Sequence, residues 1–301
     1  MRTSIIITVA FVTAASGAWH EPANLGPVVN TPFGDWYPVL TPDGAYMFFV
    51  STRPGGYGNG DIWRSANVAG EWQTPVNCGA GVNTSGLDSG ICLTSTGDKI
   101  YFASDGPGTI GDLDVWWAPV NAGQLGAKVH LGPPVNTVHR ECCPVISADG
   151  QDLYFSSEKP GGVGGHDMYV SHRAGNDWGE PVLLGAPNSV YNDCPRWVSD
   201  DGRTLAFLSW RPIGEGGCDL WYSTKTGGSW GDAVNFGAPV NSGGNEFGPW
   251  FHCNHGQMHG MIYFGSTRQG GYGDFDIWRS VDDEFPAVPP SSVGRVKAIF
   301  K

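Results

Sequence analysis

Five copies of one four-strand pattern predict an all-β protein, a five-bladed β-propeller with four-stranded blades. The glycines of a repeated hairpin turn, Gly44, Gly97, Gly150, Gly202 and Gly256, follow one another at intervals of 53, 53, 52 and 54 residues. The chain of 301 residues has 46 Gly, 22 Pro and 13 Trp but only 15% charged residues. This composition is typical of short strands joined by tight turns. The last copy lacks its fourth strand, which is found before the first copy, and this predicts a closed ring.

Residues 1–18 are expected to be a signal peptide. Met1-Arg2 is a short basic start, and Ile5–Val12 is an apolar run. Ser16 and Ala18 are small residues at the positions that precede cleavage before Trp19. The apolar run is too short for a transmembrane helix. We therefore expect a periplasmic or secreted protein without a membrane span.

Each copy has the same order of elements. Its first two strands flank a turn such as Thr41-Pro42-Asp43-Gly44, which leads to Phe48-Phe49-Val50-Ser51. A Gly-rich loop then leads to an aspartate that opens the third strand. These aspartates are Asp61, Asp114, Asp167, Asp219 and Asp276. The fourth strand is expected after a Trp such as Trp72 and ends in an Asn turn such as Val82-Asn83-Thr84.

The fifth copy lacks its fourth strand, and that strand is found at the other end of the mature chain. The matching positions are Trp19, Pro22 and Val29-Asn30-Thr31 against Trp72, Pro75 and Val82-Asn83-Thr84. Pairing the two ends in one sheet removes two exposed edges. The propeller is therefore expected over residues 19–280, with a C-terminal tail over residues 281–301.

The repeated pattern resembles a known family. Asp-Gly, an aromatic-Phe-x-Ser segment, Arg53-Pro-Gly-Gly-Tyr-Gly58 and Asp61-Ile-Trp63 are similar to the TolB-type (WD-like) β-propeller repeat of bacterial envelope and exported proteins. The resemblance extends from Trp19 to about Ser280 and implies the fold. Members of that family bind proteins, cell-wall components or glycans, often beside an OmpA-type domain, which is not expected in this sequence.

Charge narrows the class of partner. The formal net charge is −12 and the pI is about 4.9, which disfavours a partner with a phosphate backbone. A nucleic acid is therefore not expected. The expected partner is a glycan or an envelope protein, and the protein itself is expected to be a monomer.

Two sets of acidic residues recur through the copies. The strand-opening aspartates have carboxylates, which are suitable ligands for Ca²⁺. The favoured interpretation is that each carboxylate accepts hydrogen bonds from its own Gly-rich loop. No cofactor is expected. A second set precedes the innermost strands: Asp35, Asp88, Glu141, Asp193 and Glu246. At one mouth of the channel these carboxylates would either bind a cation or a polyhydroxy ligand, or cap neighbouring strands.

Residues that break the repeat are the candidates for ligand binding. They are Trp36, Tyr37, His139, Arg140, Trp197 and Trp250, together with His252. We expect them around the same mouth as the second acidic set. Aromatic rings stack on sugar faces, and carboxylates accept hydrogen bonds from sugar hydroxyls. The alternative is that these aromatic side chains fill the interfaces between blades.

The seven cysteines show no CxxC spacing of a zinc site. Cys142-Cys143 and Cys194 occupy equivalent positions in adjacent blades, so we predict a Cys143–Cys194 disulfide in preference to a copper or zinc site. No metal is expected. His255 and His259, near Cys253, are interpreted as part of a surface hairpin.

These observations predict an exported, non-catalytic binding module that recognises a glycan or a cell-envelope component at the channel mouth. One alternative is a carbohydrate-active enzyme, a glycoside hydrolase or polysaccharide lyase, with two of the five carboxylates of the second set as catalytic residues. Another is a protein–protein interaction scaffold. The sequence contains no GxSxG, HExxH or P-loop motif.

Overall fold

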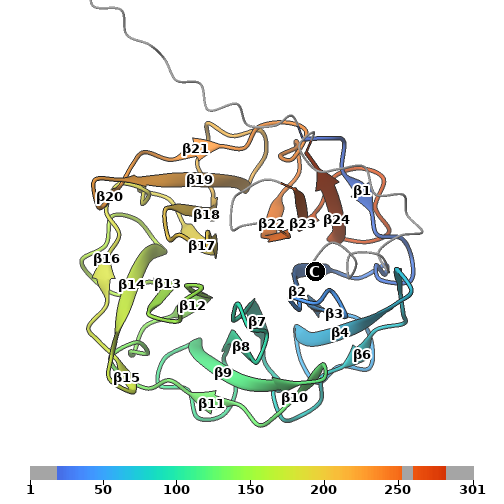
Figure 1. The fold of residues 1–301 in the computed structure, drawn as a ribbon, viewed down its shortest axis with the longest axis horizontal. Helices are drawn as coiled ribbons and strands as arrows, with labels where there is room; N and C mark the ends of the chain where they lie inside the picture. Colours follow the sequence, from blue (N-terminus) through green and yellow to red (C-terminus); the bar gives the residue numbers. More distant parts are fainter. Residues whose placement is uncertain (1–18, 253–259, 283–301) are drawn as a thin grey trace, which may run out of the picture.

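The computed structural model describes residues 19–252 and 260–282, which form a ring of five antiparallel blades (Figure 1). The first blade contains β2 (Asp35–Leu40), β3 (Tyr46–Ser51), β4 (Asp61–Val68), β5 (Glu71–Trp72) and β6 (Val76–Asn77). The predicted five-bladed propeller is confirmed.

The other blades repeat this order around the ring. The second has β7 (Asp88–Leu93), β8 (Lys99–Ser104), β9 (Asp114–Asn121), β10 (Gln124–Leu125) and β11 (Val129–His130). The third has β12 (Glu141–Ile146), β13 (Asp152–Ser157), β14 (Asp167–Ala174), β15 (Asp177–Trp178) and β16 (Val182–Leu183). The fourth has β17 (Asp193–Val198), β18 (Thr204–Ser209), β19 (Asp219–Thr226), β20 (Ser229–Trp230) and β21 (Val234–Asn235). The fifth has β22 (Glu246–His252), β23 (Met261–Ser266), β24 (Asp276–Val281) and β1 (Ala23–Asn24).

The fifth blade is closed by the N-terminal segment, as the sequence predicts. β1 pairs antiparallel with β24, and Trp19 forms a further bridge with Asp282. The Asn30 side chain accepts a hydrogen bond from the backbone N–H of Ile277 and donates one to its carbonyl. Figure 1 shows the blue β1 beside the red β24. Both ends of the propeller are thereby held in one sheet.

The fourth strand differs from the single strand that we expected. In the first blade it is divided into β5 and β6, two short segments that both pair with β4. Gln73, Thr74 and Pro75 separate them, and a proline nitrogen cannot donate to the ladder. The outermost strand therefore bends away from its neighbour between two short stretches of pairing.

The core repeats with the blades. A phenylalanine of the second strand lies directly opposite the aromatic residue of the third strand, as in Phe49 opposite Trp63. The equivalent phenylalanines, all 0% exposed, are Phe49, Phe102, Phe155, Phe207 and Phe264. Cross-strand aromatic pairs of this kind stabilise a sheet. The aromatic residues of the third strands are therefore part of the core of each blade.

Every innermost strand is irregular near its middle. In four strands the pairing register shifts after the second residue, for example between Trp36 and Val39, and in β17 it shifts after the third residue, Pro195. The third residue has a positive φ in four blades: Tyr37 (56°), Gly90 (63°), Cys143 (54°) and Gly248 (59°). Such a bulge turns side chains that would alternate between faces toward the same side.

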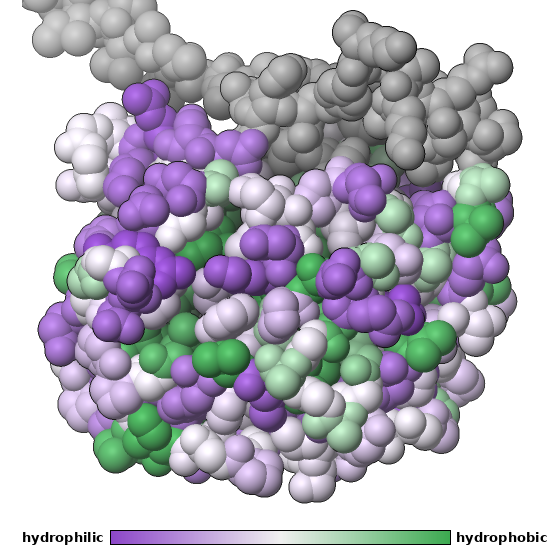
Figure 2. Space-filling model, turned by 60° about the horizontal axis from the view of Figure 1, so that its bottom comes forward, coloured by the Kyte–Doolittle hydropathy of each residue, from purple (hydrophilic) through white to green (hydrophobic). Residues whose placement is uncertain are grey.

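None of the described residues belongs to a helix long and apolar enough to cross a bilayer. On the face drawn in Figure 2, hydrophilic and hydrophobic residues are interspersed. The segments 1–18, 253–259 and 283–301, which include the expected signal peptide, Gly256, Cys253, His255 and His259, lie outside the described residues.

Candidate functional site

The strand-opening aspartates are buried and bound to their own loops. Asp61 accepts a hydrogen bond from the backbone N–H of Tyr57, and Asp167 accepts bonds from the N–H groups of Val163 and Gly164. Equivalent bonds reach Asp114, Asp219 and Asp276. All five residues are at most 1% exposed. The favoured interpretation, that each carboxylate holds its own Gly-rich loop, is confirmed.

The second acidic set is also buried within the blades. Asp35, Asp88, Glu141, Asp193 and Glu246 are all 0% exposed. Each accepts hydrogen bonds from the backbone N–H and the hydroxyl of a Thr or Ser four residues earlier, as Glu141 does from Thr137. Because their oxygens are occupied inside their own blades, the geometry favours the capping alternative over ligand binding.

Three of these carboxylates also have an arginine partner. Asp35 pairs with Arg53 at 2.5 Å, Asp193 with Arg211 at 3.1 Å and Glu246 with Arg268 at 3.3 Å. In the second blade Gly106 stands at the position of the arginine. There Lys128 approaches Asp88 from the outer part of the blade, at 3.8 Å.

Burial raises the pKa of all five carboxyl groups of the second set, although their hydrogen bonds oppose the shift. A carboxyl group whose pKa is higher in the folded than in the unfolded state stabilises the fold most below its unfolded pKa. That contribution is lost as the pH rises through the folded-state pKa. These groups therefore oppose acid unfolding.

The Glu141→Gln variant tests this pH dependence, because no cation forms an ion pair with Glu141 among the described residues. The variant's free energy of unfolding, relative to wild type, is expected to rise as the pH increases above about 4.5. The rise is about 1.4 kcal/mol for each unit by which the pKa is raised. Urea unfolding at several pH values measures it.

The control for that experiment is Asp98→Asn. The Thr96 hydroxyl lowers the pKa of Asp98, so its difference from wild type should stay constant above about pH 4. A constant difference for Glu141→Gln over the same range would contradict a raised pKa.

The six ligand-binding candidates do not form one cluster. Residues near the beginning of the innermost strands lie at one end of the channel, here called the start end. Residues near the end of those strands lie at the opposite end, the finish end. Trp36 is the second residue of β2, whereas Trp197 and Trp250 are the fifth residues of β17 and β22. Strands rise about 3.3 Å per residue, so the two groups are about 10 Å apart along the channel. The single mouth that we expected was wrong.

At the start end, the candidates behave largely as packing residues. Trp36 lies between the first and fifth blades, with its ring 6.0 Å from that of Phe275. His139 and Arg140 are half-buried in the loop before β12. This arrangement matches the alternative that aromatic side chains fill interfaces between blades.

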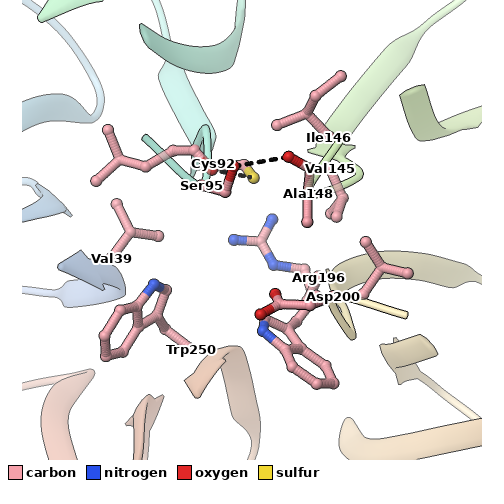
Figure 3. Close-up of a pocket in the computed structure, with 12 residues that line it drawn as sticks. Val39, Cys92, Ser95, Val145, Ile146, Ala148, Arg196, Asp200 and Trp250 are labelled. Carbon is pink, nitrogen blue, oxygen red and sulfur yellow. Dashed lines mark hydrogen bonds between the residues drawn. The ribbon is translucent and has the colours of Figure 1, made fainter. Parts of the chain in front are cut away.

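At the finish end, Trp197 and Trp250 line one cavity of about 100 Å³. Figure 3 shows side chains from all five innermost strands around it, with the Arg196 guanidinium near its centre. The strand residues are Val39, Cys92, Leu93, Val145, Ile146, Arg196, Trp197, Val198 and Trp250, and turn residues such as Ser95 and Asp200 complete the lining. This pocket is the finish-end opening of the channel.

Arg196 is the residue of this pocket that sequence reasoning missed. It is 6% exposed, and its buried Nε and Nη1 atoms have no hydrogen-bond partner among the described residues. Its guanidinium carbon lies 3.9 Å from the centre of the Tyr37 ring. The other blades have Pro38, Ile91, Pro144 or Pro249 at this position, so comparison of the five innermost strands was the signal that could have found it.

Toward the start end, the cysteines of β12 and β17 form a compact cluster. The Sγ atoms of Cys142, Cys143 and Cys194 all lie within 4.8 Å of one another, and the three residues are buried. The pKa of Cys143 is lowered, because hydrogen bonds from the Cys142 and Cys194 thiols and the charge of Arg196 stabilise its thiolate. The pKa of its two thiol neighbours is raised, since each hydrogen-bonds within the cluster as the protonated partner.

The predicted Cys143–Cys194 disulfide is not formed. Both residues are free cysteines, as are the other described cysteines. The prediction that Cys143 and Cys194 lie near each other is confirmed. The sequence positions did not show that the bulge at Cys143 turns Cys142 toward the same point, which makes a three-thiol cluster rather than a pair.

Comparisons with known proteins show a similarity in fold alone. No family model matches the sequence, and no curated protein matches it. The chain is similar to TolB from Acinetobacter baumannii, with a TM-score of 0.50 and 18% identity over 82% of this chain and 54% of TolB. It is also similar to an α-L-arabinofuranosidase from Lactobacillus brevis, with a TM-score of 0.51 and 13% identity over 85% of this chain and 92% of that one.

The likeness is one of fold. At these identities it supports the TolB-type resemblance only as a distant structural similarity, and it does not carry an activity. The chain spans only about half the length of that TolB.

Proposed function

We propose that the protein is an exported, non-catalytic binding module whose finish-end pocket takes an acidic glycan. The observation that carries the proposal is Arg196, a buried cation without a carboxylate partner among the described residues, in a pocket flanked by two tryptophans. The described carboxylates of the second acidic set are occupied within their blades, which favours binding over the enzymatic alternative.

The pocket has the three kinds of group that a sugar acid needs. Trp197 and Trp250 provide apolar surfaces for the face of a sugar ring. The exposed Asp200 and Ser95 at the rim accept or donate hydrogen bonds to hydroxyls. Arg196 supplies a guanidinium, whose fork geometry suits a carboxylate better than any other cationic side chain does.

The size of the cavity limits what enters it. About 100 Å³ holds several water molecules, which suits the carboxylate and one edge of a sugar. The rest of an oligosaccharide would lie outside, across the rim of the ring. A terminal or branching uronic acid therefore fits better than an internal neutral sugar.

Recognition of an acidic glycan is consistent with the net charge of −12 only if attraction is local. Long-range repulsion between an acidic protein and an acidic polymer is screened beyond about 8 Å at physiological ionic strength. The single guanidinium in the pocket acts at much shorter range. We therefore expect binding to strengthen as salt screens the repulsion by the rest of the surface.

Trp250→Ala tests the proposed site on a panel of immobilised acidic and neutral glycans. Wild-type protein should be retained by uronate-containing glycans and release no product. The variant should lose at least about tenfold in affinity, because stacking residues at the centre of a site commonly contribute about 2 kcal/mol. Retention measured at increasing protein concentration gives the affinity.

The matched control is Trp117→Ala, which alters a half-buried Trp of β9 whose ring contacts Lys99 and which does not line the pocket. It should bind as wild type does. Equal loss in both variants, or released sugar product, would contradict the proposal. Indifference to every glycan would instead favour the protein scaffold.

A further inference from the structure

The three-thiol cluster lies toward the start end of the channel, and Arg196 of the proposed glycan pocket is close enough to Cys143 to stabilise its thiolate. Cys142 and Cys143 come from β12, and Cys194 comes from the adjacent β17. Their Sγ atoms lie within 4.8 Å of one another. Thiolates bound to one zinc ion at about 2.3 Å in tetrahedral geometry lie about 3.8 Å apart. The thiols are therefore close to the spacing of a metal site before any ion is bound.

Cys143 occupies a backbone position that favours glycine. Its φ is +54°, and the equivalent residues of the second and fifth blades are Gly90 and Gly248. A non-glycine residue in this conformation costs about 1 kcal/mol or more. In this blade the strained backbone at Cys143 places its thiol beside the thiol of Cys142. Adjacent cysteines on a regular strand would point to opposite faces.

A histidine lies beside one member of the cluster. The Nδ1 atom of His166 lies 3.8 Å from the Sγ of Cys194. Its other ring nitrogen, Nε2, lies 2.5 Å from a carboxylate oxygen of Glu158. Ligating histidines are commonly held in this way, because the carboxylate fixes the tautomer and leaves the opposite nitrogen free to bind a metal.

This histidine is also a departure from the repeat. The equivalent residues of the other blades are Gly60, Leu113, Cys218 and Phe275. Its side chain is 18% exposed and that of Glu158 is 45% exposed, whereas the three cysteines are at most 7% exposed. The histidine is therefore more exposed to solvent than the buried thiols.

We propose that Cys142, Cys143 and Cys194 bind a thiophilic d¹⁰ metal ion, either Zn²⁺ with His166 Nδ1 as the fourth ligand or Cu⁺ through the three thiolates alone. Three thiolates and one imidazole form a known zinc donor set, and three thiolates alone satisfy Cu⁺. Such an ion would link the third and fourth blades at the channel wall. Thiol protons leave to solvent as the ion binds, so no oxidant or reductant takes part.

The experiment uses purified protein kept reduced and free of oxygen, titrated with Zn²⁺ or Cu⁺ against a chromophoric chelator. One ion should bind per chain. Cys143→Ser should weaken binding of either ion at least 100-fold. Cys78→Ser, which alters a half-buried cysteine outside the cluster, is the matched control and should bind as wild type does.

The histidine distinguishes the two ions. In the Zn²⁺ arm, His166→Ala should weaken binding strongly. Glu158→Gln should weaken it by about 10-fold, as loss of the hydrogen-bond partner of a ligating histidine commonly does. In the Cu⁺ arm both variants should bind nearly as well as wild type. Binding of Co²⁺ gives an independent signature, since sulfur-to-cobalt charge-transfer bands should appear in wild type and vanish in Cys143→Ser.

Two results would overturn the inference. One is metal binding that is equal in Cys143→Ser and in wild type. The other is a Cys143–Cys194 disulfide in protein that was never exposed to oxidant, since two of the ligands would then be consumed. Because His166 and Glu158 are partly exposed, their variants remain informative if a cysteine variant fails to fold.

Discussion

Removing residues 19–30 is expected to destroy the cooperative unfolding of the propeller. The deletion takes away β1, the Trp19–Asp282 bridge and the Asn30 side chain that clamps Ile277. It also takes away Val29, which is 0% exposed. The edge of β24 is then unpaired and can pair with a strand of another chain, which promotes aggregation. The combined loss is comparable with the whole stability of a domain, about 5–15 kcal/mol.

A point substitution tests the same ring closure with a smaller expected loss of stability. Asn30→Ala should lower the free energy of unfolding by about 2–3 kcal/mol, since it leaves a buried N–H and a buried carbonyl of Ile277 without partners. Asn83→Ala is the matched control, because Asn83 makes the same bonds to Ile62 within a blade that is continuous in sequence. Thermal unfolding of the deletion with an unchanged midpoint would contradict closure by the N-terminal segment.

Arg196→Met is expected to remove the preference for acidic glycans while leaving the fold intact or more stable. Two buried guanidinium nitrogens without hydrogen-bond partners among the described residues oppose folding, and each unsatisfied buried donor costs about 1–3 kcal/mol. Loss of the contact with Tyr37 offsets part of this gain, about 2 kcal/mol for a desolvated cation–π pair. We expect a net rise of about 1 kcal/mol in the free energy of unfolding.

The same variant should lose affinity for an acidic glycan by about 30-fold or more, because a charge-assisted hydrogen bond to a carboxylate contributes about 2 kcal/mol or more. Affinity for neutral glycans should change little. Chemical unfolding and binding are measured on the same preparation. A fall in stability of more than about 2 kcal/mol would show instead that Arg196 is a structural residue.

The fold was predictable because the repeat carries its information locally. Turn glycines at equal spacing are a local requirement, and Gly44, Gly97, Gly150 and Gly202 all have the positive φ that such turns need. Ring closure was predictable because Trp19 and Asn30 repeat the pattern of Trp72 and Asn83. No long-range information was needed for either.

The site was less predictable because its geometry depends on depth along the channel. Trp36 and Trp250 both depart from the repeat, but they are the second and fifth residues of their strands and lie at opposite ends. The second acidic set seemed to face the channel, yet each carboxylate turns into its own blade toward hydroxyls that the sequence also contains. Whether a carboxylate is buried inside a blade depends on all of its hydrogen-bond partners. It therefore cannot be derived from the position of the acidic residue alone.

The cysteine cluster was partly predictable from the sequence. Equivalence of Cys142 and Cys194 in adjacent blades was visible in the sequence and placed them near each other. The bulge that brings Cys143 to the same point, and the loop that brings His166 beside Cys194, are properties of the folded chain. They change the prediction from a disulfide to a metal site.

The central claim is that the finish-end pocket selects a carboxylate through Arg196. Calorimetric titration of an oligouronide, and of the same oligosaccharide with its carboxyl groups reduced to alcohols, into wild-type protein tests it most directly. The account predicts at least about tenfold tighter binding of the acid form, a difference of about 1.4 kcal/mol. Equal affinity for the two oligosaccharides, or tighter binding of the reduced one, would contradict it.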